Sequence, residues 1–328
     1  MDVIAQGARG FANSWPSSSK GETLNKNRLH AQPNKGMKMK RLGTLLTAAA
    51  IGLSTIGTAG AQEFGPTLDK IKESGVITIG HRETSVPFSY LGEDKQPVGY
   101  TVDICMQIVD EIKNEIGVDE LDIRWVPVTP QTRIPLMSNG TLNLECGSTT
   151  NNLTRQQQVD YAAITYITGT KLLTKKGSGI ETVEDLAGKP IALAQGTTNE
   201  RVVKAAIEER DIQDVNIVSV RDHAEGFLAL QTDRVDAYST DDILLYGLIE
   251  KARNPETYAV VGDFLSYDPY AIMLPQNDSK FRLVVNRRLA ELFRTGEIEE
   301  IYSKWFKPMS VPMSDLLSAN FKINALPK

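Results

Sequence analysis

Residues 145–156 read E-C-G-S-T-T-N-N-L-T-R-Q and follow a short strand-like run at residues 141–144. They place the hydroxyls of Ser148 and Thr150 and the guanidinium of Arg155 beyond the carboxyl end of that strand. In open α/β sheets, ligands bind in crevices at the carboxyl ends of strands. A guanidinium presents a planar pair of donors that matches a carboxylate, and small hydroxyls complete such a cradle. The stretch therefore predicts half of a site for the head group of an amino acid.

Strand and helix patterns alternate along the chain. Residues 76–79 and 121–126 are runs typical of strands, and residues 101–116 carry apolar side chains at helical spacing. This βαβα order predicts an α/β fold with a mostly parallel sheet. After residue 165 the pattern restarts as a second doubly wound unit, and residues 280–305 are again helical. The second unit has predicted strands at 171–174, 191–194, 217–220, 235–238 and 258–261, and predicted helices from 183 and at 199–209, 223–230 and 242–251.

The N-terminal segment has the pattern of an export signal. Residues 37–61 contain a basic start, M-K-M-K-R, a short apolar core and an A-G-A cleavage site, so we expect a signal peptide and a mature chain from Gln62. A membrane anchor is the alternative, but the apolar core is too short to span a bilayer. No cysteine stands at the cleavage point, so we expect no lipid anchor. Residues 1–36 suggest a disordered extension or a mis-assigned start.

The charge of the chain is acidic. It has 328 residues, with 36 Lys and Arg against 41 Asp and Glu. Residues 1–61 hold eight of the basic and two of the acidic residues, which leaves a net charge of −11 on the remainder. Such a surface does not favour nucleic acid. Because it does not attract anions at long range either, an anion site must be a local cluster of cations.

The chain has two cysteines, Cys105 and Cys146. An exported protein meets an oxidising compartment, which permits a disulfide between them. Two buried thiols are the alternative, and the sequence leaves both open because it does not set their separation.

Several motifs, in this order, resemble those of the soluble amino-acid-binding proteins of ABC importers. The resemblance is greatest to the glutamate/aspartate-binding branch and runs from about residue 67 to about residue 308. It implies the two-lobed periplasmic binding protein fold of type II, with an α/β sheet in each lobe and a two-strand hinge. The motifs are S-G-V-I-T-I-G-H-R-E at 74–83, P-F at 87–88, G-Y-T-V-D at 99–103, R-I-P at 133–135, E-C-G-S-T-T-N-N at 145–152 and L-L-T-K-K at 172–176.

The two strand–helix blocks then correspond to two lobes. We expect the chain to leave lobe one near Thr165 and to return near Tyr267, so that residues 62–165 and 267–328 form lobe one and residues 166–266 form lobe two. The cleft between the lobes is the natural ligand site. Two sequential domains with one linker are the alternative, but no Pro/Ser-rich linker is present.

The resemblance assigns one set of residues to the ligand's amino-acid head group. Ser148, Thr150 and Arg155 would bind the α-carboxylate. Thr197 and Thr198 lie at a predicted helix start, where free N–H groups favour an anion. A plain N-cap by Thr198 explains the same residues.

A second set of residues would select the ligand. The family places an aspartate for the ammonium at Asp241, which leaves Asp242 to cap the following helix, and places Arg82, Arg133 and His223 at the side-chain carboxylate. Singly, each is more typical of a surface residue. Together they favour L-glutamate and L-aspartate, because a neutral ligand would leave buried guanidiniums unpaired, at a cost of several kcal/mol.

One residue departs from the family pattern. Pro130 stands where the family has a serine, and proline supplies neither a hydroxyl nor an N–H group. One contact is lost unless Thr129 or Thr132 replaces it, so the preference between glutamate and aspartate stays open.

These features predict a periplasmic receptor, monomeric and without cofactor or metal, that delivers an acidic amino acid to the permease of an ABC importer. An enzyme on the same fold, similar to cyclohexadienyl dehydratase, is the alternative. It needs a general acid, and the candidates Glu83 and Glu145 would be held ionised by the neighbouring cations. The three histidines suggest no metal cluster and no catalytic triad. A sensor that presents its ligand to a soluble partner is a third possibility.

Overall fold

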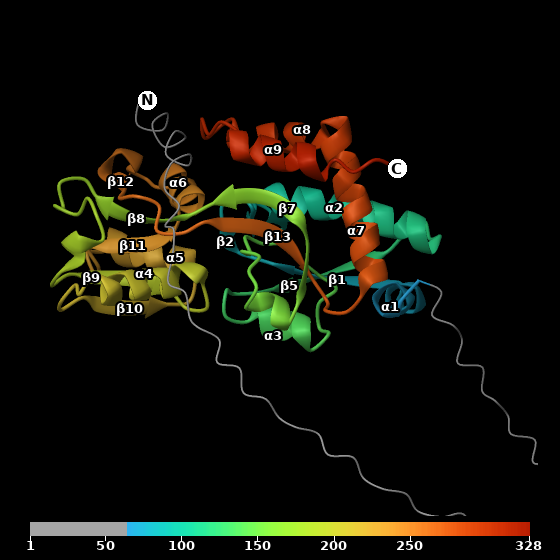
Figure 1. Cartoon of the computed structure of the whole chain (residues 1–328), viewed down its shortest axis with the longest axis horizontal. Helices are drawn as coiled ribbons and strands as arrows, with labels where there is room; N and C mark the ends of the chain where they lie inside the picture. Colours follow the sequence, from blue (N-terminus) through green and yellow to red (C-terminus); the bar gives the residue numbers. More distant parts are fainter. Residues whose placement is uncertain (1–63) are drawn as a thin grey trace, which may run out of the picture. The chain divides into compact units, whose positions relative to one another are not determined.

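The computed structural model describes residues 64–328, which form two five-stranded sheets with helices packed against them (Figure 1). The predicted signal peptide and residues 1–36 lie outside this range. In the first sheet, β13 runs antiparallel to both its neighbours and the other strands share one direction. Its strand order is β5 (Asp122–Pro127), β1 (Val76–His81), β6 (Leu144–Glu145), β13 (Asp268–Leu274) and β7 (Asp160–Thr168).

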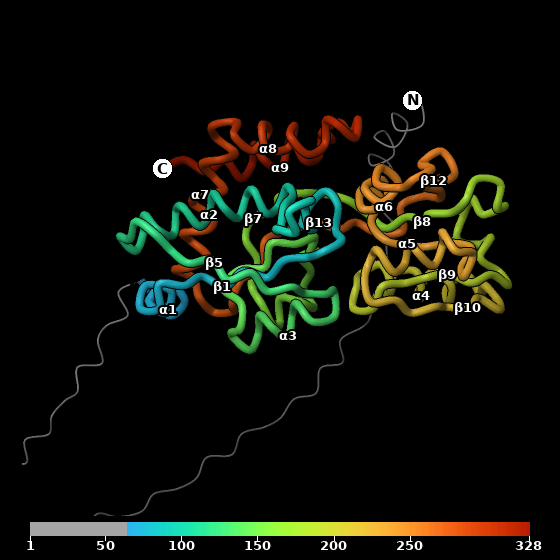
Figure 2. Tube along the Cα trace, turned by 180° about the vertical axis from the view of Figure 1, so that it is seen from behind, coloured from blue at the N-terminus to red at the C-terminus, as the bar shows by residue number. Residues whose placement is uncertain are grey.

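The second sheet repeats this arrangement, and Figure 2 shows its strands gathered apart from β1 and β5. Here β8 is the reversed strand, antiparallel to both its neighbours. The prediction of mostly parallel sheets in two lobes is therefore confirmed, with one reversed strand in each. The strand order is β10 (Asn216–Val220), β9 (Pro190–Ala194), β11 (Ala237–Asp241), β8 (Thr170–Lys175) and β12 (Tyr258–Val261).

The chain crosses between the sheets twice, which explains the reversed strands: β8 and β13 each enter their sheet directly from the other lobe. A single residue, Gly169, separates β7 from β8, and residues 262–267 separate β12 from β13. A Cβ atom on Gly169 would lie 2.2 Å from the carbonyl oxygen of Ser266. The two crossings therefore lie backbone against backbone, which only glycine permits at this point.

The helices of the first lobe bury apolar stripes against its sheet. In α2, Ile104, Ile108 and Ile112 recur at helical spacing and are fully buried. Gly296, with φ 83°, ends α7 and begins α8, so the helix expected at 280–305 is two helices. The helices are α1 (Pro66–Ser74), α2 (Tyr100–Ile116), α3 (Arg133–Ser138), α7 (Ser279–Thr295), α8 (Glu297–Phe306) and α9 (Asp315–Asn324), beside a small sheet of β2 (Thr84–Ser85), β3 (Ser89–Leu91) and β4 (Pro97–Val98).

Each of the helices α4, α5 and α6 in the second lobe begins shortly after a parallel strand in the sequence. Helix α4 (Thr198–Glu209) follows β9, α5 (His223–Gln231) follows β10, and α6 (Asp242–Glu250) follows β11. Their N-termini therefore gather at the carboxyl end of the sheet, where ligands bind in such folds. The helix expected from residue 183 is only a 3₁₀ turn, Glu184–Leu186.

The strand expected at residues 235–238 lies at Ala237–Asp241 instead. The N–H of Val235 donates to the carbonyl of Ala229 at the end of α5, so it is not available to the sheet. The strand therefore begins later and extends to Asp241. This shift places the Asp241 carboxylate at the last position of the strand.

A disulfide joins Cys105 on α2 to Cys146 in the segment after β6, and both residues are fully buried. Of the two alternatives that the sequence left open, two free thiols are therefore wrong. The crosslink ties residues 145–150 to the longest helix that precedes them.

Replacing Cys105 and Cys146 by alanine should lower the free energy of unfolding by about 2–4 kcal/mol, because the crosslink spans 41 residues of chain and restricts the unfolded state. Urea unfolding with and without reductant measures this. The double alanine variant is the control, since reductant should leave it unchanged. Equal stability of the wild type in both conditions would contradict the prediction.

Candidate functional site

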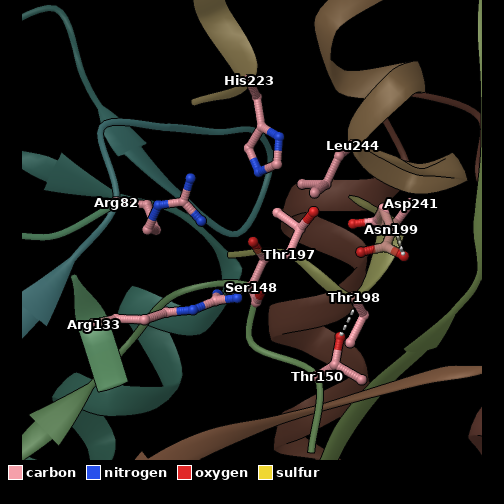
Figure 3. A pocket seen from close by; sticks show the side chains of 10 residues that line it. All are labelled: Arg82, Arg133, Ser148, Thr150, Thr197, Thr198, Asn199, His223, Asp241 and Leu244. Carbon is pink, nitrogen blue, oxygen red and sulfur yellow. Dashed lines mark hydrogen bonds between the residues drawn. The ribbon is translucent and has the colours of Figure 1, made fainter. Parts of the chain in front are cut away.

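Side chains from both lobes line one cavity (Figure 3). The contributions come from the carboxyl ends of β1, β6 and β11 and from the N-termini of α3, α4 and α5. The lining residues are Arg82, Arg133, Ser148, Thr150, Thr197, Thr198, Asn199, His223, Asp241 and Leu244.

Arg82 carries a buried guanidinium without a partner. The residue is 1% exposed, and neither Nη1 nor Nη2 has a hydrogen-bond partner. Its backbone N–H donates to Ser89 Oγ, which fixes the loop after β1. Burial, reinforced by the charge of Arg133, lowers the pKa of Arg82 to about 10. A buried guanidinium whose terminal nitrogens lack hydrogen-bond partners is costly, so this geometry favours an anion in the cavity.

Arg133 reaches the same end of the cavity from the first residue of α3. Its Nη1 donates to the Ser148 carbonyl oxygen at 3.0 Å and to Thr149 Oγ1 at 2.6 Å, and its Nε has no partner. Figure 3 shows Arg82 and Arg133 extending toward Ser148 from the same side. The Ser148 hydroxyl is itself buried without a partner. Unpartnered donors of Arg82, Arg133 and Ser148 therefore line the same cavity.

His223 completes this end of the cavity from the second lobe. Its Nδ1 lies 2.7 Å from Tyr238 Oη, and its buried Nε2 has no partner. Burial, followed by the charges of Arg82 and Arg133, lowers the pKa of His223 well below 6.5. The imidazole is therefore neutral, and it can donate one hydrogen bond to a ligand when its tautomer places the proton on Nε2.

The start of α4 contributes hydroxyls. Thr197 is the N-cap, and its Oγ1 accepts from the Glu200 N–H at 3.0 Å, so the predicted cap by Thr198 is off by one residue. Thr198 Oγ1 instead lies 3.2 Å from Thr150 Oγ1 of the first lobe. This hydroxyl pair joins the two lobes beside the cavity.

Asp241 occupies the opposite part of the cavity. Its Oδ1 accepts from Asn199 Nδ2 at 2.8 Å, and its Oδ2 accepts from the Tyr270 hydroxyl. It holds the N-cap position of α6 but makes no capping bond, while Asp242 accepts from the Ile243 N–H. The N-cap expected at Asp242 therefore lies one residue earlier, at Asp241, and ligand binding by Asp241 stays a prediction. Burial raises the pKa of Asp241 well above 3.8, and an ammonium ion beside it would restore the charged form.

Arg155 borders the cavity without lining it. Its Nη1 donates to the Thr150 carbonyl at 2.8 Å, and its Nη2 donates to the Gly196 carbonyl of the second lobe at 3.2 Å. A guanidinium has five N–H donors, so others remain for a carboxylate. Burial lowers the pKa of Arg155 to about 10, and the charge of Arg133 adds to this.

The residues at 129–132 do not replace the missing serine. The hydroxyls of Thr129 and Thr132 lie 3.2 Å apart and each accepts from the other's backbone N–H. Neither residue lines the cavity. The turn at residues 129–132 therefore supplies no hydroxyl to the lining of the cavity.

The comparisons with known proteins agree on one family. A model of the bacterial extracellular solute-binding proteins, family 3, matches residues 77–308. The chain belongs to this family. It is 41% identical over 287 residues to an L-glutamate/L-aspartate-binding protein of Pseudomonas aeruginosa, with 87% of this chain and 94% of the relative covered. It is 39% identical over 292 residues to a glutamate/aspartate import solute-binding protein of Salmonella typhimurium, with 88% and 95% covered.

A solved structure is similar as well. An ancestral amino acid-binding protein, described as a precursor of cyclohexadienyl dehydratase, has a TM-score of 0.63 and 25% identity, with 74% of this chain and all of that chain covered. That neighbour is described as a binding protein, although its descendant is an enzyme. The predicted two-lobed fold and the prediction of a solute-binding protein are thus confirmed by the family.

Within this solute-binding protein, eight of the nine residues named from the sequence line one cavity, and Arg155 lies at its edge. The sequence analysis missed Asn199 and Leu244. Asn199 follows Thr198 directly, so the G-T-T-N run could have indicated it. Leu244 lies three residues beyond Asp241, on the turn of α6 that adjoins it, and an apolar lining residue there has no signal in sequence.

A second, larger cavity lies in the second lobe. Its charged lining residues are Glu184, Arg210 and Asp263, of which Glu184 and Arg210 pair with each other at the surface. No unpartnered buried polar atom of residues 64–328 lies in its lining. Over the same residues, no cluster of His, Cys, Asp and Glu could hold a metal ion, and no helix has the length and apolar character needed to cross a bilayer. Of the two cavities, the one between the lobes is therefore the one lined by unpartnered buried polar groups.

Lowering the pH from 7 to 5 should destabilise the unliganded protein partly through His223. The unfolded chain binds a proton below about pH 6.5, whereas the folded imidazole does not, so this contribution is absent above pH 6.5 and grows as the pH falls. The loss is up to about 1.4 kcal/mol per pH unit. The difference in unfolding free energy between the wild type and His223→Gln isolates it from other groups. A difference independent of pH would contradict the assigned pKa.

Proposed function

We propose that this protein is a periplasmic receptor that captures L-glutamate or L-aspartate between its lobes and delivers it to the permease of an ABC importer. The observation that carries this proposal is the set of buried, unpartnered donors on Arg82, Arg133, Ser148 and His223, with Asp241 at the opposite part of the same cavity. An acidic amino acid brings two carboxylates and one ammonium, which together satisfy these groups. The glutamate- and aspartate-binding relatives support the same ligands.

In the proposed complex, the side-chain carboxylate meets Arg82, Arg133 and His223. Asp241 accepts from the ammonium, since each of its oxygens accepts only one hydrogen bond from the protein and has capacity for another. Arg155, Ser148 and Thr150 bind the α-carboxylate, with the N-terminus of α4 at Thr197 and Thr198 facing the same anion. These assignments use all nine residues named from the sequence.

We propose lobe one as residues 62–165 and 267–328 and lobe two as residues 166–266, with the two crossings as the hinge. The bonds from Arg155 to the Gly196 carbonyl and between Thr150 and Thr198 then join the lobes in a closed form. A ligand that contacts both lobes favours this form over an open one. The importer would recognise the closed form.

The remaining parts of the proposal concern the setting. Residues 37–61 would direct export and be removed, without lipidation, and the receptor would act as a monomer in the periplasm. A dehydratase on this fold is disfavoured. The glutamate- and aspartate-binding relatives are described as binding proteins and not as enzymes.

L-Glutamate and L-aspartate should stabilise the protein against thermal unfolding, whereas L-glutamine and 2-oxoglutarate should not. A ligand present at 100 times its dissociation constant adds about 2.7 kcal/mol to the unfolding free energy. Glutamine lacks the second anion for Arg82 and Arg133, and 2-oxoglutarate lacks the ammonium for Asp241. Thermal melting with the four compounds measures this. An equal rise in melting temperature with glutamine would contradict the proposal that the ligand must match the charges of the cavity.

Two arginine variants should separate the two ends of the ligand. Arg155→Ala removes a partner of the α-carboxylate, so glutamate, aspartate and their amides should all bind more weakly, by about 3–5 kcal/mol. Arg82→Ala should weaken the acids by a similar amount and the amides much less. The preference for acid over amide, measured by calorimetry, therefore narrows only in Arg82→Ala. If it narrows only in Arg155→Ala, the two ends of the cavity are assigned the wrong way round.

A further inference from the structure

Glu145 is a buried carboxylate that the proposed binding scheme does not use. It is the last residue of β6, in the middle of the first sheet, and it is 0% exposed. Its Oε1 has no hydrogen-bond partner, and it forms no ion pair in the part of the chain that the structure describes. A buried carboxylate without a direct counter-ion is costly, so its presence beside the cationic end of the cavity needs an explanation.

A hydrogen-bond relay connects Glu145 to Arg133. The Arg133 guanidinium donates to Thr149 Oγ1, and the Thr149 hydroxyl donates its own proton to Glu145 Oε2, each at 2.6 Å. The direction of both bonds requires an acceptor at Glu145, which a carboxylate provides. The relay holds the anion one hydroxyl away from the cation instead of against it.

Glu145 also lies beside Arg82, whose charge it stabilises through space. Gly147 shapes this contact: a Cβ atom there would lie 2.2 Å from Glu145 Oε1 and 3.0 Å from Arg82 Cγ. A glycine at this position therefore lets the carboxylate and the arginine stem approach the same side of the backbone. Glu145 and Arg82 are close enough to interact, yet the Arg82 Nη1 and Nη2 atoms stay unpartnered.

Glu145 lowers the positive charge of this end of the cavity. Arg82 and Arg133 contribute two positive charges, and the carboxylates whose charges act on Arg82 are those of Glu145 and Asp222. Asp222 is the N-cap of α5 and pairs with Arg221, whereas Glu145 forms no ion pair in the part of the chain that the structure describes. Without the charge of Glu145 this end would be more positive, and a group with more negative charge would match it better.

We infer that Glu145 is a specificity-determining residue that lowers the positive charge of this end of the cavity and so disfavours a second negative charge on the ligand side chain. This inference rests on the proposed function. Glu145 acts through Arg82 and Arg133 and does not touch the ligand. Glu145 makes the site discriminate between ligands of different charge. When the cationic end of the cavity is less positive, each added negative charge on the ligand contributes less binding free energy.

The first test compares L-glutamate with L-glutamine in the full-length protein and in Glu145→Gln. The substitution keeps the shape and an acceptor for Thr149 but removes the charge. The acid should then be preferred over the amide about tenfold more strongly than in the wild type, because a repelling anion has been removed. A merely structural role for Glu145 would weaken both ligands without widening their ratio. An unchanged or narrower ratio overturns the inference.

Two control variants accompany this test. Glu83→Gln removes an acidic residue that is adjacent to Arg82 in sequence but exposed, so the ratio should stay at the wild-type value. Glu145→Asp retains the charge and should also keep the wild-type ratio within a fewfold. If Glu83→Gln raises the glutamate-to-glutamine affinity ratio as much as Glu145→Gln does, the effect comes from net charge alone, and the specific role of Glu145 is wrong.

A second test needs no variant and so holds even if Glu145→Gln does not fold. O-Phospho-L-serine and L-serine O-sulfate have the same shape, but the phosphate carries nearly two negative charges at pH 7.5 and about one at pH 5.5, since its second pKa is about 6. The sulfate carries one throughout. Relative to the sulfate, the phosphate should bind about tenfold more tightly at pH 5.5 than at pH 7.5. A constant ratio overturns the inference.

The ratio of the affinity for the phosphate to the affinity for the sulfate is independent of changes that affect both ligands equally. Asp241 faces the ammonium that the two share, burial lowers the pKa of His223 well below 6.5, and raised pKa values keep Tyr161 and Tyr238 neutral. The charged and titratable groups around this end are Arg82 after β1, Arg133 on α3, Glu145 on β6, Tyr161 on β7, Asp222 and His223 at α5, and Tyr238 on β11.

The outcomes of these tests distinguish the two proposals. If the wild type binds neither glutamate nor any of the other ligands, the proposed function is wrong. If it binds glutamate but the acid-to-amide and phosphate-to-sulfate affinity ratios stay unchanged, only the role of Glu145 is wrong.

Discussion

The burial of two guanidiniums is the interaction on which the site depends. Arg82 and Arg133 are nearly inaccessible to solvent, yet donors on both remain without partners. Leaving a charge buried and unpaired costs several kcal/mol, which the rest of the fold must offset. An anionic ligand removes that cost, so binding and stability are linked through the same two side chains.

The two segments that link the sheets hold the binding site together. β7 and β13 belong to the first sheet, β8 and β12 to the second, and the links between them touch at Gly169 and Ser266. Next to this point, Tyr270 of β13 donates to Asp241 of β11. The proposed ammonium site is therefore built on the connection between the lobes, so a ligand at Asp241 contacts the segment about which the lobes would move.

Charge balance distinguishes this cavity from a general anion site. A cluster of cations alone would prefer the most highly charged anion. Here Glu145, one hydroxyl from Arg133 and beside Arg82, offsets part of the positive charge, and the neutral His223 adds a hydrogen-bonding group without adding charge. The acidic side chain that looked like a candidate catalytic acid in the sequence is thus better understood as a counter-charge.

The sequence by itself determined most of the alternation of strands and helices, the two-lobed fold and eight of the residues that line the cavity, because periodicity and motifs are local properties of the chain. It did not indicate β7 or β13, the strands next to the two crossings. It did not determine the disulfide, which depends on the distance between α2 and the segment after β6. Nor did it show that β11 extends to Asp241, that Arg155 bonds to two carbonyls, or that Glu145 lies between two arginines. Those features depend on which segments, distant in sequence, pack side by side, and only the tertiary structure fixes that packing.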